Sequence, residues 1–145
     1  MVRLAGRHLP VVAAMAVMVG TGLLSAVRSQ SAPGASPSKP LILEQSEVVS
    51  PCQSNGMVVH LDPKGDNYLS VQSGPGGKPY VEKDRLHSGQ EVYVCDERGG
   101  WYGVIYDLSP MRDCKYERSR NGRFEYTGPC KYGWVSKRYV EIIAG

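Results

Sequence analysis

The sequence has few of the residues on which catalysis and metal binding usually depend. Its four cysteines show no paired Cys-x-x-Cys spacing, which argues against a zinc site, and nothing else in the chain predicts a cofactor. Past residue 40 the histidines are His60 and His87, and no motif places either beside a cysteine. No stretch carries an amphipathic helical repeat of any length, which excludes a helical domain. The composition therefore favours a binding or structural protein over an enzyme.

The charge balance argues against binding of nucleic acid. The formal net charge is +3, but Arg3, Arg7, Arg28 and Lys39 precede the region that is expected to fold. The remaining thirteen basic and fourteen acidic residues leave that region close to neutral. Basic residues gather late in the chain, where residues 111–139 hold eight Lys or Arg against three acids. This cluster either meets an anionic envelope component or an acidic partner, or is only a solvated surface.

The N-terminal part has the pattern of an exported protein. Residues 1–8 contain two arginines and no acid, and residues 9–27 contain no charge. A basic stretch before an apolar one is typical of a secretory signal peptide, but the apolar stretch is also near the ~20 residues that span a bilayer. We favour a cleaved signal at residues 1–28 over an uncleaved anchor that attaches the protein to the membrane through residues 9–27. Either way, the rest of the chain is expected to be periplasmic or secreted.

A linker and a single domain follow the apolar stretch. Residues 29–40 are rich in Pro, Ser and Ala, which bury too little apolar surface to offset the entropy of ordering, so we expect a flexible linker there. Residues 41–145 are one domain's worth of chain. Within it, short alternating apolar and polar runs separated by turn residues predict an all-β fold, a small barrel or sandwich. The expected strands are 57–61, 68–72, 80–86, 90–96, 101–106, 133–135 and 140–143, with a short helical turn at 136–139.

Four motifs in this region resemble those of bacterial SH3-type domains. The run from Leu69 to Pro75 resembles the family's apolar-Asn-Val-Arg-Ser-Gly-Pro signature, and residues 86–92, 100–104 and 133–140 resemble three further family motifs in the same order. The resemblance implies a small SH3-like β-barrel and a non-catalytic role in binding cell-wall peptide, cell-wall glycan or an envelope protein. The sequence departs from the family in two places. Gln72 replaces the usual Arg, and residues 107–131 form a far longer insertion than the family's hairpin loop.

Aromatic side chains are the candidate ligand contacts. All twelve lie at residue 68 or later, and in SH3 domains such rings line a ligand groove. For any single ring, burial in the small core is the better interpretation, but for the whole set we expect at least one exposed groove. Trp101 and Tyr102 should occupy opposite faces of one strand, so that one is in the core and the other is a candidate ligand contact. The candidates are Tyr68, Trp101, Tyr102, Tyr106, Trp134 and Tyr139, together with Arg118 and Arg120 from the insertion.

The cysteines predict two disulfides in an exported domain. Cys114 and Cys130 bracket the insertion, next to strand ends that the barrel should bring together. Val92 and Val94 should face the core, which turns Cys95 outward, where it can hold Cys52 of the preceding segment. One alternative is a minimal cell-wall hydrolase with Cys95 or Cys114 as the nucleophile. Another is a disulfide-stapled accessory subunit of an envelope complex.

Overall fold

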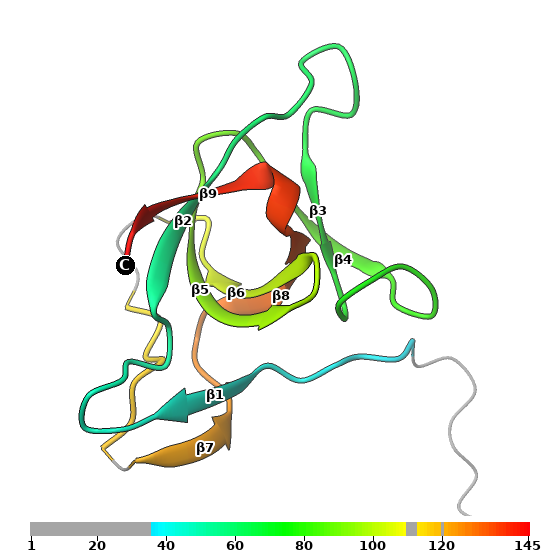
Figure 1. Ribbon diagram of the computed structural model, residues 1–145. Coiled ribbons are helices and arrows are strands. Elements are labelled where there is room, and N and C mark those ends of the chain that lie inside the picture. Colours follow the sequence, from blue (N-terminus) through cyan, green and yellow to red (C-terminus); the bar gives the residue numbers. More distant parts are fainter. Residues whose placement is uncertain (1–35, 110–112, 120) are drawn as a thin grey trace, which may run out of the picture. The chain divides into compact units, whose positions relative to one another are not determined.

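The computed structural model describes residues 36–109, 113–119 and 121–145 (Figure 1). The expected signal or anchor at residues 1–28, its apolar part at residues 9–27, and most of the expected linker lie outside these residues. Within the described part, no helix has the length and apolar character needed to cross a membrane. The secondary structure there consists of β-strands and one short 3₁₀ turn, η1 (Lys137–Tyr139), so the all-β prediction is confirmed.

Seven strands form one antiparallel sheet in the order β4-β3-β8-β6-β5-β2-β9. Six of them, β3, β4, β5, β6, β8 and β9, lie where the sequence predicts them, within a few residues. The predicted first strand is displaced, because β2 begins before residue 57 and ends at Val58. The bounds are β2 (Ser54–Val58), β3 (Leu69–Gln72), β4 (Glu82–Leu86), β5 (Glu91–Arg98), β6 (Trp101–Tyr106), β8 (Lys131–Ser136) and β9 (Val140–Ala144).

This sheet is curled but is not the closed barrel that the SH3-type resemblance implies. Its two edge strands, β4 and β9, do not pair with one another. Register shifts leave one extra residue in each of β4, β5 and β9, namely Lys83, Cys95 and Ile143, and such an extra residue bends its strand and increases the twist. All seven strands consequently send buried side chains into one core on the inner face. That core contains Val58, Leu69, Val71, Leu86, Val92, Val94, Val104, Tyr106, Val135 and Val140.

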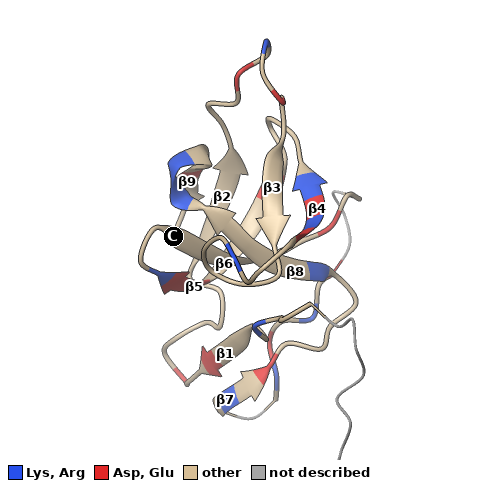
Figure 2. Cartoon of the chain, turned by 90° about the vertical axis from the view of Figure 1, so that its right-hand side faces the viewer, with Lys and Arg blue, Asp and Glu red and all other residues tan. Residues whose placement is uncertain are grey.

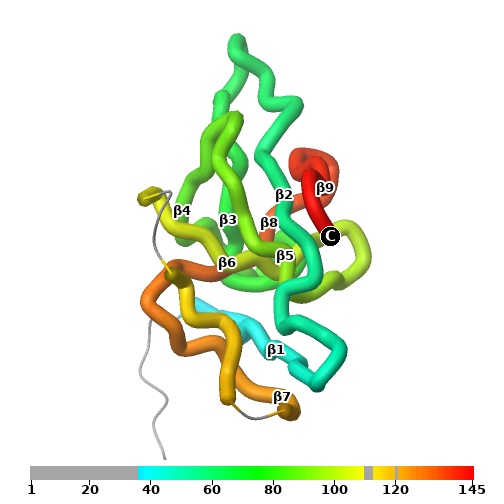
Figure 3. Tube along the Cα trace, turned by 90° about the vertical axis from the view of Figure 1, so that its left-hand side faces the viewer, coloured from blue at the N-terminus to red at the C-terminus, as the bar shows by residue number. Residues whose placement is uncertain are grey.

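A second, two-stranded sheet, β1 (Ile42–Gln45) with β7 (Gly122–Glu125), is absent from the sequence-based prediction. Figure 3 shows the two strands side by side, next to β5 and β6. Leu41 and Leu43 are fully buried in a second core, against Ile105 and Trp134 on the outer face of the large sheet. Residues 107–131 are therefore not the simple surface loop that we expected. They supply β7 and much of this second core, because the outer face of β6 and β8 is apolar and has to be covered.

The ordered domain also begins earlier than the predicted boundary at residue 41. The hydroxyl of Ser73 donates a hydrogen bond to the carbonyl of Pro37 (2.7 Å), and the N–H of Lys39 donates to the carbonyl of Ser73 (2.7 Å). The indole N–H of Trp134 donates to the carbonyl of Lys39 (3.4 Å). The last residues of the expected linker thus pack on the sheet, because the ends of β3 and β8 offer backbone and indole partners to them.

Both disulfides join the pairs that the sequence predicts. Cys52 is bonded to Cys95, and Cys114 is bonded to Cys130. In β5, Val92 and Val94 face the inner core, whereas Cys95 packs against the second core. One bridge therefore attaches the segment before β2 to the outer face of the sheet, and the other closes the segment that contains β7. Two disulfides in so small a domain fit an oxidising compartment.

Candidate functional site: an aromatic groove and a charged pocket

Two of the six candidate aromatic residues belong to the cores. Trp134 has 0% of its surface exposed and Tyr106 has 2%. The Tyr106 hydroxyl donates a hydrogen bond to Asp84 (3.2 Å), and burial together with that carboxylate raises the pKa of Tyr106. Side chains that are covered in this way do not reach a ligand. Our assignment of Trp134 and Tyr106 as ligand contacts is corrected here: both rings fill the interior of a small domain.

Three other candidates come together. Tyr68, Trp101 and Tyr139 are each half-buried and line one groove with a volume of about 340 Å³. They come from the start of β3, the start of β6 and the end of η1. The remaining lining residues are Leu61, Asp62, Asp66, Asn67, Leu69, Ser70, Gln72 and Ser136.

The floor of the groove is the outer face of the large sheet. Because side chains alternate along a strand, Tyr68, Ser70 and Gln72 share one face of β3. Leu69 and Val71 lie between them along the strand and face the other way, into the inner core. On the other side of the floor, Trp101 pairs in register with Ser136 of β8. The Gln72 amide donates to the Ser70 hydroxyl (2.6 Å), so the residue that replaces the family's Arg is held within the floor.

The wall of the groove is the turn between β2 and β3, residues 61–67. The Asp62 carboxylate accepts a hydrogen bond from the N–H of Lys64 (2.8 Å), and the Asp62 carbonyl accepts one from the N–H of Gly65 (3.1 Å). Below this turn, the N–H of Val59 donates to the carbonyl of Tyr139 (3.0 Å). The acidic turn and the Tyr139 ring are therefore anchored to one another through the backbone.

Carboxylates give the groove its charge. Asp62 and Asp66 are exposed, and they are the charged side chains among the described lining residues. The Arg85 guanidinium lies 4.1 Å from the centre of the Tyr68 ring and bonds Glu82 at 2.6 Å. The hydrogen bond to Glu82, followed by the negative charges of Glu82 and Asp66, raises the pKa of Arg85. Arginine thus covers one side of Tyr68, and the rest of the ring borders the groove.

Tyr102 lies apart from this groove. As predicted, Trp101 and Tyr102 occupy opposite faces of β6, since Trp101 packs against the second core and Tyr102 against the inner one. The expectation that one of them would be a buried core residue is wrong, because both are half-buried. The Lys137 ammonium group lies 4.9 Å from the Tyr102 ring centre and bonds Glu97.

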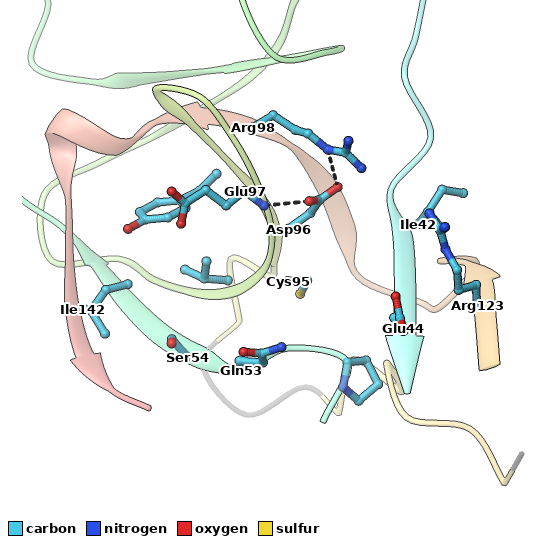
Figure 4. A pocket seen from close by; sticks show the side chains of 13 residues that line it. Ile42, Glu44, Gln53, Ser54, Cys95, Asp96, Glu97, Arg98, Arg123 and Ile142 are labelled. Carbon is cyan, nitrogen blue, oxygen red and sulfur yellow. Dashed lines mark hydrogen bonds and ion pairs between the residues drawn. The ribbon is translucent and has the colours of Figure 1, made fainter. Parts of the chain in front are cut away.

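Tyr102 instead borders a second hollow, which we name the charged pocket (Figure 4). Its volume is about 450 Å³, and it lies between β1, the C-terminal half of β5 and the middle of β9. The Asp96 carboxylate accepts hydrogen bonds from its neighbours, the N–H of Glu97 (2.7 Å) and Nε of Arg98 (3.2 Å). The lining residues are Ile42, Glu44, Pro51, Gln53, Ser54, Val94, Cys95, Asp96, Glu97, Arg98, Tyr102, Arg123 and Ile142.

Arg118, the basic candidate of the insertion that the structure describes, lines neither the groove nor the charged pocket. Arg118 is exposed and lies 4.6 Å from the centre of the Phe124 ring, with Nη2 donating to the Thr127 hydroxyl (3.1 Å). Its backbone exchanges two hydrogen bonds with the Gln45 amide, at 2.7 and 2.8 Å. Arg118 thus helps to hold the segment before β7 against β1. Arg120 lies outside the described residues.

All four cysteines are in disulfides, which leaves neither Cys95 nor Cys114 as a thiol. Across residues 36–109, 113–119 and 121–145, no cluster of His, Cys, Asp or Glu has the arrangement of a metal site. Sequence reasoning found the three rings of the groove but missed Asp62 and Asp66 as its wall. Their turn-forming sequence was the available signal.

No protein-family model, curated protein or solved structure matches the chain significantly.

Proposed function

We propose that this protein is a non-catalytic binding module of the cell envelope, and that Tyr68, Trp101 and Tyr139 form its ligand site. The observation that carries the proposal is the convergence of these three half-buried rings, from three separate segments, on one groove. Aromatic side chains offer large contact area at low cost in conformational entropy, which suits them to recognition. The motifs shared with bacterial SH3-type domains support the same role.

The chemistry of the groove favours a peptide that carries a positive charge. The aromatic floor suits an extended chain, and Asp62 and Asp66 on the wall would attract an amino or guanidinium group. Cell-wall peptide is the ligand class that we favour, with an envelope protein or glycan as the other candidates. The N-terminal sequence pattern and the two disulfides support a periplasmic or secreted location.

The two alternative functions, a hydrolase and an accessory subunit, require different features of the protein. A hydrolase with a Cys nucleophile needs a thiolate, and both candidate cysteines are bonded to another sulfur in this structure. An accessory subunit of an envelope complex needs a protein partner but no cell-wall affinity. Binding to purified cell wall therefore separates the favoured function from the accessory role.

The test is co-sedimentation of the domain with purified cell-wall sacculi. We expect the wild-type domain to sediment with the sacculi. Trp101→Ala and Tyr139→Ala should each weaken the affinity for sacculi tenfold or more, because the loss of an aromatic contact at the centre of a binding site costs about 2 kcal/mol of binding free energy. Tyr102→Ala is the matched control, since Tyr102 is equally half-buried but lies outside the groove. Equal loss in all three variants would place binding elsewhere, and no sedimentation of the wild-type domain would favour the accessory role.

Fluorescence gives a second readout of the same binding. Trp134 is fully buried, so iodide should quench only the emission of Trp101, which is half-exposed. Sacculi should then protect Trp101 from iodide if the groove is occupied. Binding that leaves the quenching of Trp101 unchanged would contradict the proposed site.

A further inference from the structure

Independently of ligand binding, the fold places two chemically similar asparagines in very different surroundings. The chain has three asparagines, and two of them precede a glycine, in the pairs Asn55–Gly56 and Asn121–Gly122, whereas Asn67 precedes Tyr68. Glycine has no side chain, so nothing on it hinders its own backbone nitrogen. That nitrogen can approach the side-chain amide of the preceding asparagine. Each Asn-Gly pair is therefore a place where the chain can react with itself.

The fold protects the first of these pairs. Asn55–Gly56 lies in β2, where Gly56 is buried and pairs with Val92 of β5 on one side and with Ile142 of β9 on the other. A methyl group on Gly56 would lie 2.5 Å from Cγ1 of Val140, so neighbouring side chains crowd the backbone. The main chain can rearrange here only when the strand leaves the sheet. Such openings are rare for a strand that is paired on both sides.

The second pair lies at the surface. Asn121–Gly122 is at the start of β7, in the small sheet that forms one end of the domain (Figure 2). Both residues are exposed, and a methyl group on Gly122 would meet no described atom within 4 Å. The φ angle of Gly122 is +126°, a conformation that residues with a side chain rarely adopt. The position therefore gives the asparagine side chain the space to turn toward the Gly122 nitrogen.

The backbone of Gly122 is held at the end of a short ladder. The N–H of Tyr126 donates to the carbonyl of Leu41 (2.9 Å), which by alternation makes Gln45 and Gly122 a hydrogen-bonded pair. This pair is the last one between β1 and β7. Freeing the Gly122 nitrogen thus breaks only the end of the ladder, and strand ends open far more often than strand interiors.

We propose that Asn121 is a site of spontaneous deamidation through a cyclic succinimide. The Gly122 nitrogen forms a bond to Cγ of Asn121, and the side-chain nitrogen takes the proton of the Gly122 N–H and leaves as ammonia. Water then adds to one of the two ring carbonyl groups and breaks its bond to the Gly122 nitrogen. The products are aspartate and isoaspartate, each with a new carboxylate.

Isoaspartate changes the small sheet, whereas aspartate does not. In isoaspartate the main chain runs through the former side chain and is one carbon atom longer, so Gly122 is displaced from its position opposite Gln45. The Gln45 side chain also exchanges two hydrogen bonds with the backbone of Arg118, at 2.7 and 2.8 Å. The displacement therefore acts on both segments that Gln45 holds. Aspartate keeps the main chain and adds only a charge.

The test is incubation of the intact, oxidised protein in mildly alkaline buffer, which speeds the reaction because the attacking nitrogen has to lose its proton. Cleavage after glutamate places Asn121 in residues 118–125, and Asn55 and Asn67 in residues 48–82. Mass spectrometry locates each lost amide, and an isoaspartyl methyltransferase detects isoaspartate. In the folded protein, Asn121 should react at least about tenfold faster than Asn55, which the sheet protects. It should also react at least about tenfold faster than Asn67, which is exposed but precedes a bulky tyrosine.

Unfolding is the matched control for the role of the fold. In guanidinium chloride, Asn55 should react as fast as Asn121, because both precede glycine. A difference that persists in the unfolded protein, or equal rates at Asn121 and Asn55 in the folded one, would refute the structural basis of the proposal. Aspartate formed without isoaspartate would exclude the succinimide. Asn121→Gln should suppress the reaction at this position.

Hydrogen exchange tests the effect on the small sheet. The Gln45 amide should exchange faster in the isoaspartate form than in the untreated protein. Asn121→Asp supplies the same charge with an ordinary main chain, and it should leave the exchange of Gln45 unchanged. Equal exchange of Gln45 in the isoaspartate form and in Asn121→Asp would refute the displacement of Gly122.

Discussion

The hydroxyl of Tyr126 donates a hydrogen bond to the carbonyl oxygen of Cys114 over 2.7 Å. The same hydroxyl accepts a hydrogen bond from the N–H of Cys130 (3.1 Å), so a single oxygen lies between both ends of the disulfide. Tyr126 is 2% exposed, and the ring meets Tyr132 edge-on with 5.9 Å between centroids. The disulfide and the tyrosine thus act together to hold the segment before β8 in place.

Tyr126→Phe should lower the free energy of unfolding by about 1–3 kcal/mol, because it removes two buried hydrogen bonds, one to the carbonyl of Cys114 and one from the N–H of Cys130. Urea unfolding of the oxidised protein measures this. Tyr116→Phe is the matched control, since the Tyr116 ring also packs in the second core, at 4.9 Å from Tyr93, without a hydroxyl hydrogen bond. A cost for Tyr126→Phe no larger than that for Tyr116→Phe would show that the two hydrogen bonds do not stabilise the fold.

Gly103 lies directly against Leu41, the residue that precedes β1. A methyl group on Gly103 would lie 2.6 Å from Cδ1 of Leu41 and 3.3 Å from Cη2 of Trp134. Gly103→Ala should therefore destabilise the protein by about 1–3 kcal/mol through overpacking of the second core. Gly100→Ala, in the exposed turn before β6 with open space around it, should change stability by less than about 0.5 kcal/mol. Thermal unfolding of both variants checks the contrast.

Removal of the two disulfides should lower the free energy of unfolding by different amounts. Peptide mapping of unreduced protein should show Cys52 joined to Cys95 and Cys114 joined to Cys130. Replacing Cys114 and Cys130 together by Ala should cost about 3 kcal/mol in the chain-entropy model, and replacing Cys52 and Cys95 together about 4 kcal/mol because that loop is longer. Recovery of a peptide that links Cys52 to Cys114, or of a free thiol, would contradict this pairing.

Asp84 should make stability depend on acidic pH. Burial raises the pKa of Asp84, but hydrogen bonds from Lys131 (2.7 Å), Arg85 and Tyr106 outweigh it, so the pKa lies below its ordinary value. The ionised carboxylate therefore adds stability above the unfolded-state pKa of about 3.9, and this is lost as pH falls through the folded-state pKa. Asp84→Asn should cost up to about 1 kcal/mol at pH 7, because Lys131 is exposed, and less at pH 2, where protonation of Asp84 weakens the ion pair.

Urea unfolding at several pH values tests this dependence. Glu141→Gln on the exposed side of β9 serves as the matched control. A cost for Asp84→Asn that is the same at pH 7 and at pH 2 would show that the ion pair is not its source.

Local signals in the sequence determined most of the large sheet. In β3 and β5 the apolar side chains alternate with polar ones, and alternation of that kind predicts strands without knowledge of their partners. The same alternation predicted that Cys95 turns away from Val92 and Val94, and hence its bond to Cys52. The small sheet escaped prediction because β1 and β7 are four residues each and pair across the chain, with Ile42 opposite Glu125.

Trp101 and Trp134 show what only the tertiary structure decided. Each follows a glycine in a predicted strand, so their local sequences give no reason to distinguish them. Trp134 is fully buried because Leu41 and the carbonyl of Lys39, from the other end of the domain, cover it. Trp101 is left half-exposed beside Tyr68 and Tyr139. Alternation assigns a side chain to a face of the sheet, but burial depends on which distant segment packs on that face.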